Sequence, residues 1–339
     1  MKKVFISGIT GQDGAWLAKL LLEKGYKVYG GVRNKNNIDS WRLVYLGINS
    51  SIEYINFNLT DRQCIESVIQ KIKPDEFYNL AAQSNVAESY NSPVETSLVD
   101  GMGVLYLLES IKKFSPHSKF FQASSSEIFG NSLTKIQNEN TAMNPVSPYA
   151  VAKAYAHWMV INYRNSFNIY AINGILYAHE SELRSKTFFT RKISLHVANW
   201  NLGIKKILEI GNLDAEKDWG YAKEFVEGIY LAMQGITPED FIFATGTKVK
   251  LKSFIDHSYS LIGINLCWEG ENENLKAYNS NSGELIIKTN PEFYRPINIH
   301  TACGDASKAE KLLNWKPKLN YQKISEIMIQ ADINKLRHE

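Results

Sequence analysis

The sequence predicts an α/β protein with a doubly wound parallel sheet and a smaller second domain that is partly interleaved with the first. Strand-like and helix-like segments alternate through the first half of the chain, and a glycine-rich turn joins the first strand to the first helix. After about Leu176 the pattern changes to loops and shorter elements. We therefore expect one domain at 1–176, to which about 217–246 returns, and a second at 177–216 and 247–339.

Each expected element follows from its hydrophobic pattern. Apolar and aromatic runs predict buried strands at 2–7, 26–32, 51–58, 75–82 and 119–124. Apolar residues at helical spacing predict helices at 14–25, 61–73 and 102–114. Ser147 followed by Pro148 is typical of a helix start and predicts a further helix at 147–164.

Composition limits the classes of function. The chain has 339 residues, of which 44% are hydrophobic and 22% charged, as in soluble globular proteins. No apolar run reaches membrane-spanning length, and Gly and Asp interrupt the start too early for a signal peptide. The three cysteines have neither disulfide nor metal-ligand spacing, and a net charge of +3 is too small to indicate nucleic acid. We expect a cytoplasmic protein without a metal, a membrane or a nucleic-acid partner.

The turn "GITGQDG" predicts a Rossmann-type dinucleotide site. Gly8, Gly11 and Gly14 lie between the first strand and the first helix. Glycines there permit a tight turn and let the backbone approach a pyrophosphate, while the helix N-terminus supplies N–H groups and positive potential. A glycine-rich turn without a ligand is the alternative, and the strand-turn-helix context favours the nucleotide site.

The end of the second strand concerns the adenosine half of such a ligand. An acidic residue would suit the ribose hydroxyls of NAD. Here the sequence reads "GGVRNKNN", with Arg33 near the tip and Lys35 close behind. A cation suits a 2′-phosphate, so the sequence favours NADP. The alternative is that Arg33 is a solvated surface residue.

Tyr149 and Lys153 form Tyr-x-x-x-Lys on the expected helix at 147–164. Their spacing places both side chains on one face of the helix. An ammonium group beside a phenol favours phenolate, which would lower the pKa of the tyrosine towards a working range. The pair predicts a base for a sugar hydroxyl during hydride transfer. The alternative is a half-buried tyrosine beside a solvated lysine.

The stretch "QASSSEIFG" places hydroxyls and a carboxylate at the end of a buried strand. That end lies at the carboxyl edge of the sheet, where ligands bind. Ser125 can hydrogen-bond the oxygen that Tyr149 deprotonates, and Glu127 can face the same crevice. Hydride transfer alone needs no carboxylate, whereas eliminating water from a 4-ketosugar does. Helix capping by Ser124 is an alternative that could coexist with this role.

With these residues in place, the chain resembles the extended short-chain dehydrogenase/reductase superfamily and, within it, the GDP-mannose 4,6-dehydratase family over nearly its whole length. The matching stretches are "GITGQDG", "NLAAQS", "QASSSE", "SPYAVAK", "NGILYAHES", "TRKI", "GNLDAEKDWGYAKEFV", "YRP" and "NWKP". The resemblance implies a lyase that oxidises C4 of a GDP-linked manno-sugar, eliminates water across C5 and C6, and returns the hydride to C6. It also implies tightly bound NADP that is recycled within the catalytic cycle.

The site residues follow from the motifs and the resemblance together. The expected catalytic residues are Ser125, Glu127, Tyr149 and Lys153. The expected cofactor-binding residues are Gly8, Thr10, Gly11, Gln12, Asp13, Gly14, Arg33, Asn58, Leu59, Leu80, Ala81, Ala82, Gln83, Ser84, Lys153, His179 and Arg184. The expected substrate-binding residues are Ser84, Ser125, Ala178, Lys192, Lys217, Arg295 and Asn298, with Lys192 matching a position near guanine and Arg295 one near the diphosphate.

The chain departs from the family pattern at several of these positions. Asn34 replaces a second arginine, which weakens both the preference for NADP and the tetramer contacts made by this loop. Ala178 replaces an asparagine that faces the sugar, which opens space and removes a donor. That change would suit a larger sugar such as a manno-heptose, and neutral change in a loop is the alternative. The other replacements are Ser125 for threonine, Asn58 for aspartate, Glu95 for tyrosine, Lys217 for arginine and Asn298 for glutamate.

Three classes of function compete. The first is a 4,6-dehydratase acting on GDP-mannose or, alternatively, on GDP-D-glycero-D-manno-heptose. The second is a GDP-sugar C4 oxidoreductase or epimerase, which would not need Glu127. The third is a nonenzymatic dinucleotide sensor, which would need neither Tyr149 nor Lys153. The complete set of four residues favours the dehydratase, working as a homodimer or homotetramer on a GDP-linked sugar.

Overall fold

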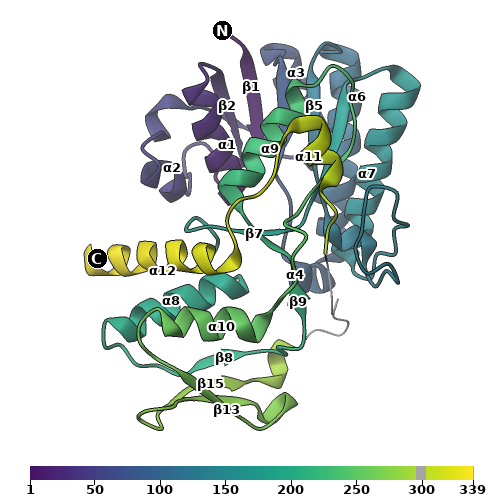
Figure 1. Cartoon of the computed structure of the whole chain (residues 1–339). Helices are drawn as coiled ribbons and strands as arrows, with labels where there is room; N and C mark the ends of the chain where they lie inside the picture. Colours follow the sequence, from purple (N-terminus) through teal and green to yellow (C-terminus); the bar gives the residue numbers. More distant parts are fainter. Residues whose placement is uncertain (295–302, 339) are drawn as a thin grey trace.

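The computed structural model describes residues 1–294 and 303–338 (Figure 1). A seven-stranded sheet forms the centre of the larger part of the molecule, in the order β11-β6-β5-β4-β1-β2-β3. All of its strand pairs are parallel, which confirms the predicted fold class. The strands are β1 (Lys3–Ser7), β2 (Lys27–Val32), β3 (Glu53–Asn56), β4 (Glu76–Asn79), β5 (Lys119–Ser125), β6 (Ala171–Leu176) and β11 (Phe241–Phe243).

The strand order reverses between β1 and β4. The chain runs outward from β1 to β2 and β3, then crosses back to β4 on the other side of β1. In open parallel sheets, ligands bind outside the carboxyl ends of the strands at such a reversal. The loops after β1, β4 and β5 therefore mark the expected ligand crevice.

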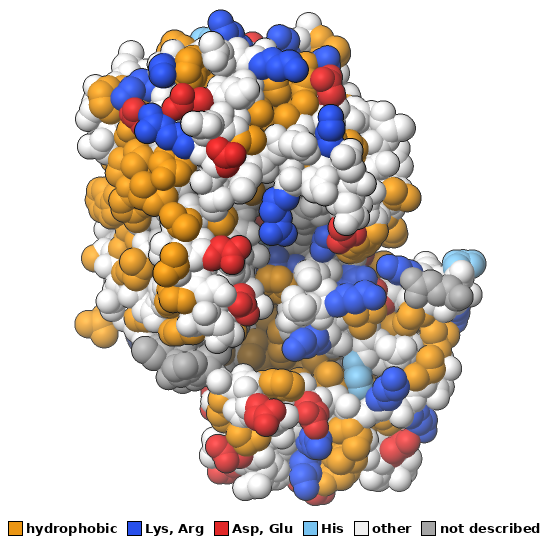
Figure 2. All heavy atoms as spheres, turned by 180° about the vertical axis from the view of Figure 1, so that it is seen from behind, with side chains coloured by type: hydrophobic (Ala, Val, Ile, Leu, Met, Phe, Trp, Pro, Cys, Tyr) orange, Lys and Arg blue, Asp and Glu red, His pale blue; other side chains and the backbone are white. Residues whose placement is uncertain are grey.

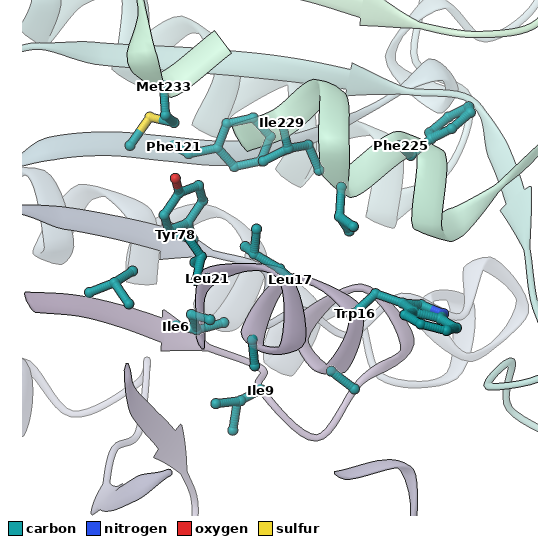
Figure 3. Packing of buried hydrophobic residues seen from close by; sticks show 14 of the residues in the cluster. Ile6, Ile9, Trp16, Leu17, Leu21, Tyr78, Phe121, Phe225, Ile229 and Met233 are labelled. Carbon is teal, nitrogen blue, oxygen red and sulfur yellow. The ribbon is translucent and has the colours of Figure 1, made fainter. Parts of the chain in front are cut away.

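Helices cover both faces of this sheet. One face carries α1 (Gln12–Glu23) and α9 (Ala222–Gln234), and the other carries α3 (Arg62–Ile72), α6 (Gly103–Phe114) and α7 (Pro148–Phe167). Figure 3 shows the first face, where Leu17 and Leu21 of α1 lie between that helix and Ile229 of α9. Such a two-sided covering explains why the strands read as continuous apolar runs.

Successive strand residues enter opposite cores, as the alternation of side chains in a strand requires. Ile6 packs with the α1 side of the sheet, whereas Phe5 packs with the α3 side. In the same way, Phe121 packs on the α1 side and Phe120 on the α3 side. Each fully buried side chain of this size stabilises the fold by roughly 1.5–3 kcal/mol.

The smaller part of the molecule is a four-stranded sheet covered by helices. The strand order is β13-β14-β15-β8, and Figure 1 shows α12 beside α8 and α10 on one side of that sheet. Its core includes Ile193, Phe254, Ile287 and Ile329. The elements are β8 (Leu208–Ile210), β13 (Leu266–Glu269), β14 (Lys276–Asn279), β15 (Leu285–Thr289), α8 (Phe189–Asn201), α10 (Leu251–Ser260) and α12 (Tyr321–His338).

Short elements connect the two parts. Two-stranded pairs form between β7 and β10 and between β9 and β12. The bounds of the remaining elements are α2 (Trp41–Tyr45), α4 (Val86–Asn91), α5 (Pro93–Ser97), β7 (Ala178–Glu180), β9 (Glu216–Lys217), β10 (Trp219–Tyr221), β12 (Val249–Lys250) and α11 (Ser307–Leu313). Over the described ranges, no helix combines the length and apolar character needed to cross a membrane.

The course of α11 bears on the domain boundaries. The sequence places all of 247–339 in the second domain, but Ala309 of α11 and the following Trp315 pack into the core that contains Phe225 of α9. We keep the two-domain division as a proposal and add α11 to the first domain, because its apolar side chains stabilise that core.

Candidate active site

A cleft of about 520 Å³ lies at the carboxyl edge of the large sheet. Its lining comes from the turn after β1, the end of β5, the start of α7, and residues of the smaller part. Figure 2 shows the hollow between the two parts of the molecule, with basic side chains along it. A concave site between two parts, at the strand-order reversal, is a common place for a nucleotide ligand.

The end of β5 presents Ser125 and Glu127 to this cleft. The Ser125 Oγ accepts a hydrogen bond from the Glu127 N–H at 3.2 Å and so caps the 3₁₀ turn Ser126–Phe129. Ser124, for which helix capping was the alternative, instead pairs its Oγ with the His157 Nδ1 at 3.1 Å. A serine hydroxyl has two lone pairs and one proton, so capping leaves Ser125 able to donate to a ligand.

Tyr149 and Lys153 enter the cleft from the first turns of α7. The Ser147 Oγ accepts from the Ala150 N–H at 3.1 Å, which fixes the start of the helix. Tyr149 is 8% exposed and Lys153 only 3%. The Lys153 Nζ donates to the Ala123 carbonyl at 3.1 Å and lies 5.7 Å from the centre of the Tyr149 ring. The i, i+4 spacing therefore brings both groups to one site.

The electrostatics of this pair differ from the sequence expectation. Burial raises the pKa of Tyr149 above its ordinary value, and the Asp100 carboxylate raises it further, although Ser125 acts to lower it. Burial also lowers the pKa of Lys153. The expectation of a lowered tyrosine pKa is wrong for this structure, because residue spacing carries no information on how deeply the pair is buried.

The cationic side chain of Lys217 lies close to Glu127, the expected base of the elimination step. The Lys217 Nζ lies 3.8 Å from the Glu127 Oε1, and both side chains are partly buried, at 23% and 18% exposure. Lys217 comes from β9 and Glu127 from the 3₁₀ turn after β5, and both line the cleft. An ion pair of this length leaves both groups able to contact a ligand.

The glycine turn is packed too closely for side chains. A Cβ on Gly8 would lie 2.7 Å from the Ala81 nitrogen, and the φ of Gly8 is +70°. A Cβ on Gly14 would lie 2.3 Å from the Gly8 oxygen. Gly11 caps α1 without a side chain. These contacts match a turn that brings backbone N–H groups close to a pyrophosphate.

A charged pair joins this turn to the smaller part of the molecule. The His179 Nε2 lies 2.9 Å from the Asp13 Oδ2, and the Nδ1 lies 2.7 Å from the Tyr177 carbonyl. Burial acts to lower the pKa of His179, but the Asp13 carboxylate raises it overall. Burial acts to raise the pKa of Asp13, but His179 and Arg184 lower it overall. Both ring nitrogens of His179 face acceptors, which favours the imidazolium form.

The cleft gathers most of the expected site residues, but not all of them. Those that line it are Gly8, Gly11, Gln12, Asp13, Gly14, Leu80, Ala82, Ser84, Ser125, Glu127, Tyr149, Lys153, Ala178, His179, Arg184, Lys192 and Lys217. Those outside its lining are Thr10, Arg33, Asn58, Leu59, Ala81 and Gln83. Arg33 directly follows β2, at the same carboxyl edge as the cleft. Arg295 and Asn298 lie outside the described residues.

Sequence reasoning missed several residues at the site. The cleft is also lined by Tyr90, Phe189 and Trp219. Asp100 is buried close enough to Lys153 and Tyr149 to affect the pKa of each. Its signal in the sequence was a single acid in the apolar run "SLVDGMGVL", whereas the aromatic residues gave no signal.

The fold and these residues define an extended short-chain dehydrogenase/reductase. Solved structures of similar fold are a dTDP-glucose 4,6-dehydratase from Bacillus anthracis in complex with NAD (TM-score 0.81, 17% identity, covering 99% of this chain and 98% of that one) and RMD from Pseudomonas aeruginosa complexed with NADPH (TM-score 0.75, 16% identity, covering 98% of this chain and all of the other). At these identities the likeness concerns the fold.

Sequence comparison gives the family. The family model described as GDP-mannose 4,6 dehydratase matches residues 5–328. The GDP-mannose 4,6 dehydratase of Cricetulus griseus is 42% identical over 99% of this chain and 92% of its own length. The GDP-mannose 4,6-dehydratase of Vibrio cholerae is 41% identical over 98% of this chain and 94% of its own length. The chain belongs to the GDP-mannose 4,6-dehydratase family, a family of lyases.

Proposed function

We propose that this protein converts GDP-mannose to GDP-4-keto-6-deoxymannose. The observation that carries the proposal is the position of Glu127, a carboxylate in the same cleft as Ser125, Tyr149 and Lys153. An oxidoreductase or epimerase acting at C4 has no need of that carboxylate, and a sensor has no need of the other three. The names of the similar family members support mannose over a heptose as the sugar.

The residues of the glycine turn fit a nicotinamide dinucleotide. The close approaches at Gly8 and Gly14 support a pyrophosphate on the backbone at the start of α1. Arg184 lines the same region of the cleft, where its positive charge would favour the diphosphate. When bound, this cofactor supplies a hydride acceptor for C4 and then a hydride donor for C6.

The protein groups carry the proton transfers. Tyr149, with Ser125 hydrogen-bonded to the same substrate oxygen, takes the proton of the C4 hydroxyl as C4 is oxidised. The resulting ketone acidifies the proton at C5. Glu127 removes the C5 proton and gives a proton to the departing C6 hydroxyl, which leaves as water. Tyr149 and Glu127 thus act in sequence at C4 and C5. When C6 is reduced, C5 takes up one proton, which balances the proton that Tyr149 removed, so no proton is consumed overall.

The basic residues opposite α7 support binding of the GDP group. Lys217 lines the cleft at 3.8 Å from Glu127, and Lys192 lines it from α8. The Lys192 Nζ also lies 5.3 Å from the centre of the Phe293 ring, at the same wall. A diphosphate ligand between these lysines would have its charge balanced on the protein side. Ala178 lines the cleft and leaves room beside the sugar.

The proposed function predicts a redox-balanced reaction. Incubation with GDP-mannose and no added reductant is expected to yield a product lighter by one water, without accumulation of free reduced nicotinamide. Mass spectrometry and absorbance measure the two quantities. Offering GDP-manno-heptose in parallel tests the larger sugar, which we expect to react less well. Stoichiometric release of reduced cofactor would mean a simple dehydrogenase instead.

Cofactor preference makes a separate prediction. We propose NADP, tightly bound and recycled, because Arg33 follows β2 with an exposed side chain where a 2′-phosphate would lie. Arg33→Ala is expected to narrow the preference for NADP over NAD by roughly 5- to 30-fold, since one charge-assisted hydrogen bond is lost. Calorimetric titration with both cofactors measures the ratio, and Lys35→Ala is the control. Equal affinity of the unmodified protein for both cofactors would contradict the proposal.

We also propose a homo-oligomer and a cytoplasmic location. Three exposed apolar residues lie on one face of α7: Val151, Tyr155 and Trp158, at 54%, 40% and 59% exposure. Their i, i+4, i+7 spacing forms a continuous stripe. Val94 and Leu98 are exposed on the neighbouring segment, at 71% and 40%. An apolar face of this kind on a soluble enzyme supports burial against a second copy of the chain.

A further inference from the structure

Asp100 is a buried carboxyl group to which the proposed mechanism assigns no role. It is 1% exposed and lies on a π-helical turn, Leu98–Met102, between α5 and α6. Its Oδ1 accepts a hydrogen bond from the Gln83 N–H at 2.9 Å. Among the described residues, its Oδ2 has no hydrogen-bond partner, although it is shielded from solvent. A carboxylate oxygen buried in this way destabilises the fold, so its presence at a site calls for a functional reason.

The turn that carries Asp100 is fixed firmly against α7. A Cβ on Gly101 would lie 3.3 Å from the Tyr155 ring and 3.7 Å from the Ala152 carbonyl. A Cβ on Gly103 would lie 2.9 Å from the Leu59 carbonyl. Gly101 thus lets the turn approach α7 closely, and Gly103 lets it approach the segment that contains Leu59. Insertions of π-helical geometry are frequent at functional sites, and here the insertion places Asp100 beside the first turns of α7.

Two groups of α7 are within electrostatic reach of Asp100. Burial raises the pKa of Asp100 to about 6, while the Lys153 ammonium and the Gln83 N–H act to lower it. In return, Asp100 acts to raise the pKa of Lys153 and also raises that of Tyr149. The other groups facing Tyr149 are Glu127, which raises its pKa, and Arg184 and Ser125, which lower it.

We propose that Asp100 sets the charge of the Tyr149–Lys153 pair. As a carboxylate it holds Lys153 as ammonium and opposes loss of a proton from the pair, and as a neutral acid it no longer does so. Asp100 acts through these two residues, so it is a positioning residue. The inference rests on the proposed roles of Tyr149 and Lys153.

The direction of the effect does not depend on which group of the pair ionises first. With Tyr149 neutral and Lys153 protonated, the pair carries one positive charge. Losing a proton from either residue makes the pair neutral overall, and a nearby negative charge opposes that loss. Removing the carboxylate therefore lowers the pKa of the first proton loss.

Asp100→Asn tests this directly, because it keeps the shape of the side chain and removes its charge. The acid limb of kcat/KM for GDP-mannose is expected to move to lower pH by about one unit, the scale of a neighbouring charge. At pH values below the wild-type limb, kcat/KM of the variant is then roughly tenfold larger than kcat/KM of the wild type, when each is expressed as a fraction of its own maximum. This shift is expected only at pH above about 6, where Asp100 is ionised in the wild type.

Asp332→Asn is the matched control. Asp332 is 0% exposed, and its carboxylate is held by Arg191 and Ser194 on α8, away from Tyr149. The control loses a buried carboxylate as well, and its acid limb is expected to stay in place. Loss of activity in both variants without a shift of the limb would show that Asp100 is only structural, which overturns the proposal.

A second measurement needs neither substrate nor turnover. The infrared band of protonated carboxyl groups is expected to contain a component that titrates near pH 6 in the wild type and is missing in Asp100→Asn. Asp100→Ser, smaller and also neutral, replaces this variant if the asparagine form does not fold. A component that persists above pH 8 in the wild type and is missing in Asp100→Asn would mean that Asp100 stays neutral over the working range, which overturns the proposal. Failure of the proposed function would be seen separately, as a wild-type protein that does not turn over GDP-mannose.

Discussion

Glu127→Gln is expected to lower dehydration of GDP-mannose by ~10²–10⁴-fold, the scale of a lost general acid or base. Glutamine keeps the shape of the side chain but cannot accept the C5 proton. Oxidation at C4 depends on Tyr149 and Ser125, so it is expected to continue. The 4-ketosugar then cannot lose water across C5 and C6. The reduced nicotinamide stays bound to the protein, because its hydride has no acceptor at C6.

Two observations on this variant distinguish the steps. Absorbance of reduced nicotinamide is expected to rise once per active site after GDP-mannose is added, with little further turnover. Exchange of the C5 hydrogen with deuterated water is expected to disappear, because Glu127 is the proposed base for that proton. Both measurements follow single turnovers and do not depend on product release.

The control is Glu209→Gln. Glu209 lines the same cleft, but its carboxylate is bound to Lys288 at 2.8 Å and to the Asn290 amide at 2.9 Å. A carboxylate engaged in this way is not free for proton transfer, so this variant is expected to retain dehydration. Normal dehydration by Glu127→Gln would show that the elimination base is a different group.

Much of this site could be predicted from local sequence. The turn at Gly8 to Gly14 and the spacing of Tyr149 and Lys153 are set by residues close together in the chain. Parallel strand pairing then brings the ends of β1, β4 and β5 to one edge, so the sequence pattern alone predicts that Ser125 and Tyr149 share one site, as the lining of the cleft shows.

The parts that sequence could not predict depend on packing between distant segments. Asp100 lies beside α7 because a π-helical turn and Gly101 bring the two segments together. The ion pair of Lys217 with Glu127 depends on how β9 is placed across the cleft. The pKa of Tyr149 was expected to fall and instead rises, because burial outweighs the other influences on the phenol. These effects depend on distances and solvent exclusion, which spacing along the chain does not encode.

Tyr149→Phe is expected to stop the reaction one step earlier than Glu127→Gln. Phenylalanine keeps the ring but removes the hydroxyl that would take the proton from the C4 oxygen. Oxidation at C4 is expected to fall by ~10²–10⁴-fold, and dehydration falls with it because no ketone forms to acidify C5. The absorbance of reduced nicotinamide should therefore stay flat after GDP-mannose is added, in contrast to its rise in Glu127→Gln.

Tyr163→Phe is the control for loss of a buried phenol on the same helix. Tyr163 is 6% exposed, and its hydroxyl donates to the Glu109 carboxylate away from the cleft. This variant is expected to lose some stability and to keep both steps. Oxidation at the wild-type rate by Tyr149→Phe would remove Tyr149 from the mechanism.

The double variant Tyr149→Phe with Glu127→Gln tests the order of the steps. If C4 oxidation precedes elimination, Tyr149→Phe prevents formation of the ketone. Glu127→Gln then cannot lower the rate further, because elimination is no longer reached. The rate of the double variant is therefore expected to equal that of Tyr149→Phe, so the effects are strongly non-additive. C5 exchange should be absent in both. If the two losses instead multiply, each residue acts independently of the other, and elimination does not depend on prior oxidation by Tyr149.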